Sequence, residues 1–186
     1  MNSTNGQCSL FLCPRQHDFS FDDDSVLISV LQGAGFISEK INAQDTSNRY
    51  LTGDNFLNYV AYMGCAPAIK FEASEDDSNF CFIQLHHYDS AKLIQNKKPF
   101  RAPHCPHCNK PVMDWNDDST STTILCESCN TASSLEELNW RKSAGYARLF
   151  IEITDIFPKE AIPHQVLLDK LADAVDTEWH YFYACL

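Results

Sequence analysis

Two closely spaced pairs of cysteines constrain this chain more than any other feature of its sequence. Cys105 and Cys108 form the first pair, Cys126 and Cys129 form the second, and seventeen residues separate the two pairs. Two residues between cysteines let both sulfurs of a tight turn reach one ion, and two such turns complete a tetrahedron. The spacing therefore predicts that these four cysteines bind one metal ion.

The residues around the two pairs resemble the zinc-ribbon family. The first turn reads Cys-Pro-His-Cys-Asn and the second reads Cys-Glu-Ser-Cys-Asn, so Asn109 and Asn130 stand where ribbons commonly have glycine. Asparagine is the non-glycine residue that most readily adopts positive φ, so both turns remain feasible. The resemblance covers residues 99–132 and implies a hairpin with strands at 112–115 and 122–125 and its tip at 116–119.

The resemblance implies a structural Zn2+ as the cofactor. Four cysteine ligands leave no open coordination position, which a catalytic zinc requires. The same four thiolates would also suit a rubredoxin-like iron, which is the alternative metal. We therefore expect the ion to stabilise the fold and assign no catalytic residue to it.

The net charge favours some partners over others. Fourteen Lys and Arg against twenty-five Asp and Glu give a formal charge of -11. Such a surface repels nucleic acid phosphates and favours basic proteins, peptides or cations. Lys97, Lys98, Arg101 and Lys110 flank the first cysteine turn, but nearby acidic residues offset them. We expect a protein partner and no nucleic acid.

The nine cysteines and the absence of a targeting pattern favour an intracellular location. An odd count with two Cys-x2-Cys pairs indicates reduced thiols, and we expect the remaining five cysteines to pack as small hydrophobic residues. The sequence has no apolar stretch of the roughly 18 to 20 residues that span a bilayer, and its first apolar run is too short for a signal peptide. We expect a cytoplasmic protein with no membrane association. The five remaining cysteines are Cys8, Cys13, Cys65, Cys81 and Cys185.

The apolar pattern predicts an α+β fold with a mixed or antiparallel sheet, helices on one face and an inserted zinc ribbon. We expect four segments: an N-terminal arm (1–22), two halves of an α+β domain (23–98 and 133–186), and the ribbon insertion (99–132) between them. Helices are predicted from 25 to 33 or 35, over 54–63 and after Pro163. A hairpin is predicted from 69–71 and 80–85, a loop over 37–52, and further strands over 148–157 and 179–185.

Other polar groups suggest sites, each with a simpler structural interpretation. His86 and His87, with Asp89, could provide a base or a second metal site, but adjacent strand residues point to opposite faces. A metal site at Cys8, Cys13 and His17 would lack a fourth ligand. Paired acids at a ribbon tip resemble those of transcript-cleavage factors, although a solvated turn explains them equally well. These paired acids are Asp117 and Asp118.

Aromatic and cationic residues near the C-terminus could pack in the core or anchor an interface. They are Trp140, Arg141, Trp179, Tyr181 and Tyr183. The segment Gly145–Ile153 and the Trp-x-Tyr-Phe-Tyr ending also look like those of conserved bacterial proteins of unassigned function, a resemblance that implies no residue roles.

We predict a non-catalytic, zinc-containing binding protein whose acidic surface engages a protein partner. One alternative is an enzyme or redox protein that uses a cleft outside the ribbon, near His86, His87 or Glu160. The other is a nucleic-acid or transcription-associated zinc-ribbon protein. The sequence contains no Gly-rich phosphate loop, Gly-x-Ser-x-Gly elbow or His-Glu-x-x-His helix that would favour an enzyme.

Overall fold

The structure is a computed structural model of the 186-residue chain. It describes residues 8–21, 23–42, 47–63, 69–73, 79–96, 101–113 and 123–186. Within these residues, no helix is long and apolar enough to cross a membrane.

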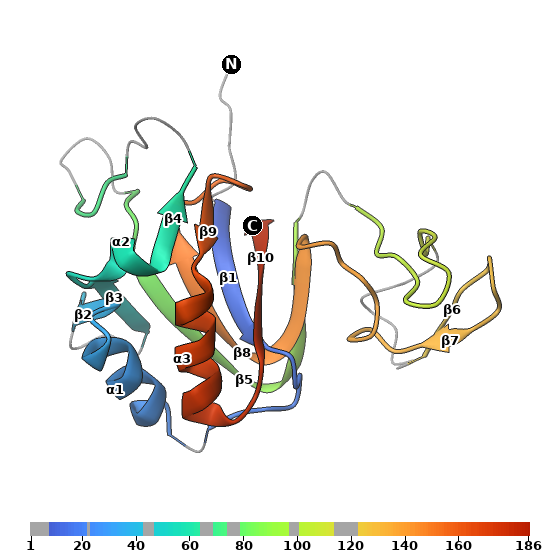
Figure 1. Ribbon diagram of the computed structural model, residues 1–186, viewed down its shortest axis with the longest axis horizontal. Helices are drawn as coiled ribbons and strands as arrows, with labels where there is room; N and C mark the ends of the chain where they lie inside the picture. Colours follow the sequence, from blue (N-terminus) through green and yellow to red (C-terminus); the bar gives the residue numbers. More distant parts are fainter. Residues whose placement is uncertain are drawn as a thin grey trace.

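A six-stranded antiparallel sheet forms the body of the molecule (Figure 1). The strand order is β10-β1-β8-β5-β3-β2, so the first and last strands of the chain are neighbours. Every pairing is antiparallel, and the sheet carries a few helices, as expected for an α+β fold. The strands are β1 (Cys8–Pro14), β2 (Ile37–Lys40), β3 (Asn48–Thr52), β5 (Ile83–Gln95), β8 (Ala144–Thr154) and β10 (Trp179–Cys185).

The helices pack on one face of the sheet, where they build the main core. Leu27 and Leu31 of α1 (Ser25–Gly33) and Leu167 and Leu171 of α3 (Gln165–Val175) are almost fully buried there. Their spacing puts the leucines on one stripe of each helix, and burial of each side chain contributes about 1.5–3 kcal/mol. The short α2 (Phe56–Tyr59) and the two-stranded ladder of β4 (Val60–Tyr62) and β9 (Ala161–Pro163) complete this layer.

The other face is covered by the sheet itself, which coils back over a second cluster. The register of β5 against β8 shifts between His87 and Lys92, and such a bulge bends a strand. Phe11, Phe150 and Phe182 are fully buried in this cluster, and Phe11 stacks on Phe182 at a centroid distance of 5.2 Å. The bend brings the first residues of β8 above the outer strand β10.

The prediction of a loose arm over residues 1–22 is wrong for residues 8–14. These residues form β1, a central strand in which every residue is buried. The sequence did not reveal this because β1 is apolar on both faces and too short to show a period. Residues 1–7 lie outside the described part of the chain.

Three predictions for residues 37–85 are also wrong. The expected loop over 37–52 contains β2, the edge strand of the sheet, and β3 beside it, and both strands are rich in polar residues. The expected helix over 54–63 stops at Tyr59, because the next three residues pair with β9. The expected hairpin partner at 69–71 is irregular, and its carbonyl at Lys70 accepts the backbone N–H of Cys81.

The expectation that Cys8 and Cys185 are free thiols is contradicted. The two residues are direct cross-strand partners in β1 and β10, and they form a disulfide. Their separation of 177 residues in sequence hid this pairing, because no local pattern brings the two ends of a chain together. Cys13 and Cys81 are free and buried, as expected, and Cys65 lies outside the described residues.

Candidate metal centre and adjoining cavity

The four paired cysteines come together in a lobe that extends from one end of the sheet. We call residues 101–113 and 123–140 the cysteine module; it lies at the right in Figure 1. The four Sγ atoms all lie within 4.8 Å of one another. Cys105 Sγ is 3.7 Å from Cys129 Sγ, and Cys108 Sγ is 3.6 Å from Cys126 Sγ. These sulfurs, contributed in pairs by two turns, could hold one metal ion.

The two cysteine turns have the same backbone geometry. Asn109 has φ 57° and donates its N–H to the carbonyl of Cys105 at 2.9 Å. Asn130 has φ 55° and donates its N–H to the carbonyl of Cys126 at 2.7 Å. A positive φ is where glycine is favoured and asparagine is tolerated. The prediction for both asparagines is therefore confirmed.

Neighbouring donors stabilise negative charge on the sulfur atoms. The backbone N–H of His107 donates to Cys105 Sγ at 3.4 Å. Hydrogen bonds with the hydroxyl and backbone of Thr131 lower the pKa of the Cys129 thiol to about 6. Cys105 and Cys126 are buried, whereas Cys108 and Cys129 are partly exposed. A cluster of this kind attracts a cation.

A small core connects the cysteine module to the sheet. Leu138 and Trp140 are buried in it together with Cys105 and Cys126, and Ala144 of β8 belongs to the same cluster. The backbones of His104 and Asn139 exchange two hydrogen bonds of 2.8 and 2.9 Å, which tie the first cysteine turn to the returning chain. The module also contains a short ladder of β6 (Ile124–Leu125) and β7 (Ala132–Ser133).

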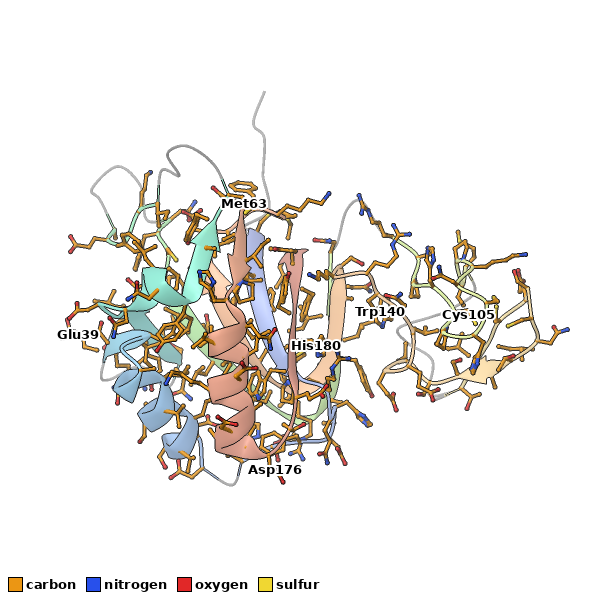
Figure 2. All side chains as sticks on the ribbon, in the orientation of Figure 1. Glu39, Met63, Cys105, Trp140, Asp176 and His180 are labelled. Carbon is orange, nitrogen blue, oxygen red and sulfur yellow. A yellow bond between two sulfur atoms is a disulfide. The ribbon has the colours of Figure 1, made fainter. Side chains whose placement is uncertain are left out.

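A cavity of about 850 Å³ lies where the segment that leads from the cysteine module into β8 meets α3 and β10. Figure 2 shows Trp140 between His180 of β10 and Cys105 of the module. The cavity brings together four of the five aromatic and cationic residues singled out from the sequence, namely Trp140, Arg141, Trp179 and Tyr181. Tyr183 instead lies in the core, where its hydroxyl donates to the carbonyl of Ala161 at 2.6 Å.

A strained turn borders this cavity. Ser143 donates its N–H to the carbonyl of Trp140 at 3.0 Å, and the two central residues, Arg141 and Lys142, have φ of 51° and 62°. Two successive positive φ values define a type I′ turn, which usually contains Asn and Gly. Non-glycine residues in this region cost of order 1–3 kcal/mol each. This strain could not be predicted from the sequence, because neither residue is typical of a type I′ turn.

The paired histidines point to opposite faces, as the sequence predicted. His86 Nε2 lies 2.6 Å from Glu152 Oε2, whereas His87 Nδ1 lies 3.2 Å from Asp24 Oδ1 at the start of α1. No sequence pattern pointed to Glu152 or to Ser9, whose hydroxyl donates to Glu152 Oε1 at 2.6 Å. Because Ser9 is 1% exposed, this cluster holds neighbouring strands together and offers no accessible nucleophile.

The remaining candidate residues do not assemble into a site. Cys8 is in the disulfide, Cys13 Sγ lies 3.3 Å from His180 Nε2, and His17 contacts Glu136. His86, His87 and Glu160 do not line the cavity. Glu160 accepts a hydrogen bond from the backbone of Phe157. The suggested acids Asp117 and Asp118 and the basic Lys97 and Lys98 lie outside the described residues.

No protein-family model, curated protein or solved structure matches this chain. The functional assignment therefore depends on the chemistry of its own residues.

Proposed function

We propose that this chain is a non-catalytic binding protein in which a structural zinc ion holds the cysteine module as a zinc ribbon. In this proposal the module supplies one wall of the cavity, and a protein partner inserts a side chain or chain end there. The observation that carries the proposal is the position of Trp140, which is packed with Cys105 and Cys126 and also lines the cavity. A metal ion that orders the cysteine module would therefore also hold Trp140 in its position in the cavity wall.

The sulfur spacing supports zinc at this centre. A tetrahedron with Zn–S bonds of about 2.3 Å places its sulfur atoms roughly 3.8 Å apart. The two Sγ–Sγ distances in the structure, 3.7 and 3.6 Å, are close to this spacing. A rubredoxin-like iron uses nearly the same geometry, so elemental analysis must distinguish the two metals. Four sulfur ligands also favour a structural role.

Metal analysis of purified protein tests the metal part of the proposal. We expect one zinc per chain in the wild type and in His107→Ala, whose exposed imidazole is not part of the four-sulfur cluster. We expect Cys126→Ser to lose the zinc and to unfold the module, while circular dichroism still reports the sheet. One iron per chain, or full zinc retention in Cys126→Ser, would contradict this assignment.

The binding part is tested by comparing wild-type protein with one variant changed inside the cavity and one changed outside it. Wild-type protein, Trp179→Ala and Lys170→Met are immobilised and exposed to the same native extract at moderate salt. Lys170 is an exposed α3 residue outside the cavity lining. We expect a protein that is retained by wild type and Lys170→Met and lost with Trp179→Ala or after zinc removal. Equal retention by all baits would reject the cavity as the binding surface.

A cytoplasmic location is part of the proposal and has its own test. The cytosol keeps most thiols reduced, so this location predicts that Cys8 and Cys185 are reduced to free thiols in the living cell. Rapid alkylation of cells followed by mass spectrometry reports the state of both residues. A fully oxidised pair in freshly trapped cells would favour an oxidising compartment.

A further inference from the structure

Two cations at the cavity have no carboxylate partner among the described residues. Lys142 Nζ lies 3.9 Å from the centre of the Tyr181 ring and also contacts the hydroxyl of that tyrosine. Arg141 Nη1 donates to His104 Nε2 at 2.9 Å, which is an acceptor only when the imidazole is neutral. In a chain with a formal charge of -11, two cations that contact only neutral groups are unusual. They leave positive charge available to a ligand.

The acidic residues of the cavity each have a hydrogen-bond or ion-pair partner other than these two cations. Glu178 pairs with Arg15 at 2.9 Å, and Asp169 accepts a hydrogen bond from Gln165. Glu137 accepts the backbone N–H of Ser134 at 2.8 Å, and Glu136 lies 3.7 Å from His17. Each carboxylate therefore has a local partner, and among the described residues none of them forms an ion pair with Lys142 or Arg141.

A buried donor also lacks an acceptor at this site. Trp179 lines the cavity, is 5% exposed, and its indole Nε1 has no hydrogen-bond partner. An unpaired buried N–H is unfavourable, so such groups usually have a partner in the functional state. A ligand oxygen in the cavity would provide one.

The strained turn fixes the backbone of the two cationic residues. Arg141 and Lys142 hold consecutive positive φ values, and the carbonyl of Lys142 accepts the N–H of Tyr183 in β10. Strain of this kind persists only where the surroundings impose it, and it concentrates at ligand sites. Here the backbone of β10 and the Trp140–Ser143 hydrogen bond impose it. The turn directs adjacent cationic side chains toward an aromatic cavity.

We infer that the cavity binds an aromatic carboxylate, whose oxygen atoms contact Lys142 and the Trp179 indole and whose ring packs against the aromatic wall. Arg141 adds positive charge beside them. A volume of about 850 Å³ is ample for such a ligand and far exceeds a single ion. The inference uses the cavity of the proposed function and identifies the group that enters it. The carboxylate belongs either to a free organic acid or to the C-terminus of a partner.

Matched small probes test this inference directly. Zinc-loaded, ¹⁵N-labelled protein is titrated with 3-phenylpropionate and with 3-phenylpropionamide, while the Trp179 indole N–H signal, assigned with Trp179→Phe, is followed by NMR. We expect the acid to shift this signal to saturation and the amide to bind about tenfold more weakly, because it lacks the charge that strengthens the hydrogen bonds. Equal binding of both probes, or no saturable shift with the acid, would overturn the inference.

Variants test whether the ammonium group of Lys142 binds the carboxylate. We expect Lys142→Met to weaken binding of the acid about tenfold, Lys142→Arg to preserve it, and Lys170→Met, with the same change in net charge, to have no effect. Circular dichroism and thermal melts establish that each variant is folded. If Lys170→Met and Lys142→Met weaken binding equally, the loss comes from the change in net charge, and Lys142 does not form the site. If Lys142→Met does not fold, Arg141→Gln replaces it, with a smaller loss expected.

A tripeptide Gly-Gly-Phe, with a free or an amidated C-terminus, separates the two sources of the carboxylate. Tighter binding of the free-ended peptide than of 3-phenylpropionate assigns the site to a partner's C-terminus, and weaker binding assigns it to a free acid. If the acid binds equally well after zinc removal, the carboxylate site is supported. The proposed role of zinc in ordering the cavity wall is then rejected. If zinc removal abolishes binding of the acid, both proposals are supported.

Discussion

Asn109 and Asn130 close the two cysteine turns with nearly identical backbone conformations, at φ 57° and 55°. Each donates its N–H to the first cysteine of its own pair, so each sets the direction in which the two sulfurs of that pair point. The geometry of the cysteine cluster therefore depends on two residues that are not cysteines.

Substitution at Asn109 tests this dependence. We expect Asn109→Ala to destabilise the module by about 1 kcal/mol, because an alanine Cβ disfavours the left-handed conformation, and Asn109→Gly to be neutral or stabilising. The readout is the concentration of a competing chelator that removes half of the zinc. A chelator midpoint in Asn109→Ala equal to that of wild type would contradict the prediction.

Gly145 is required by a close approach between β8 and β10. A Cβ at this position would lie 2.2 Å from Cε1 of Phe182, a fully buried ring that is packed between other aromatic rings. We expect Gly145→Ala to reduce the free energy of unfolding by about 1–3 kcal/mol, as measured by urea denaturation. Gly33→Ala is the matched control, because its Cβ would meet nothing within 4 Å at the end of α1, and it should be neutral or slightly stabilising. Equal stability of both variants would refute the coiled packing of the sheet.

The Cys8–Cys185 disulfide links the first and last strands of the sheet. Closing a long loop restricts the unfolded chain, so we expect selective reduction, or the double substitution Cys8→Ser with Cys185→Ser, to lower the free energy of unfolding by about 2–4 kcal/mol. Retained zinc confirms that the cysteine module is intact. Wild-type stability in the double variant would show that β1–β10 pairing needs no covalent link.

Because His180 is buried, we expect the free energy of unfolding to fall in mild acid. Burial, with a smaller contribution from the charge of Arg15, lowers the pKa of this imidazole from 6.5 to about 4. The unfolded chain therefore binds a proton between pH 6.5 and 4 that the folded chain does not, so the free energy of unfolding falls as the pH falls through this window. We expect the slope of stability against pH to be smaller in His180→Gln. An unchanged slope would assign the acid sensitivity to other groups.

Much of the C-terminal half was predictable from sequence because its signals are local. The alternation through Leu149, Ile151 and Ile153 predicted β8, and the leucine spacing after Pro163 predicted α3. The edge strand β2 and its neighbour β3 were missed because they are short and rich in polar side chains and show little alternation. The helical period after Phe56 was misleading, because Leu57 and Met63 are more than half exposed and Val60 pairs with another strand.

The sequence by itself determined the cysteine cluster, because Cys-x2-Cys spacing and an αL asparagine act within five consecutive residues. Only the tertiary structure decided that Cys8 meets Cys185, that His86 meets Glu152, and that Trp140 shares a cavity with Trp179. Each of these pairs is formed by sheet register or by the coil of β8 over β10. Such contacts depend on loop closure and packing of distant segments, which leave no periodic trace in the chain.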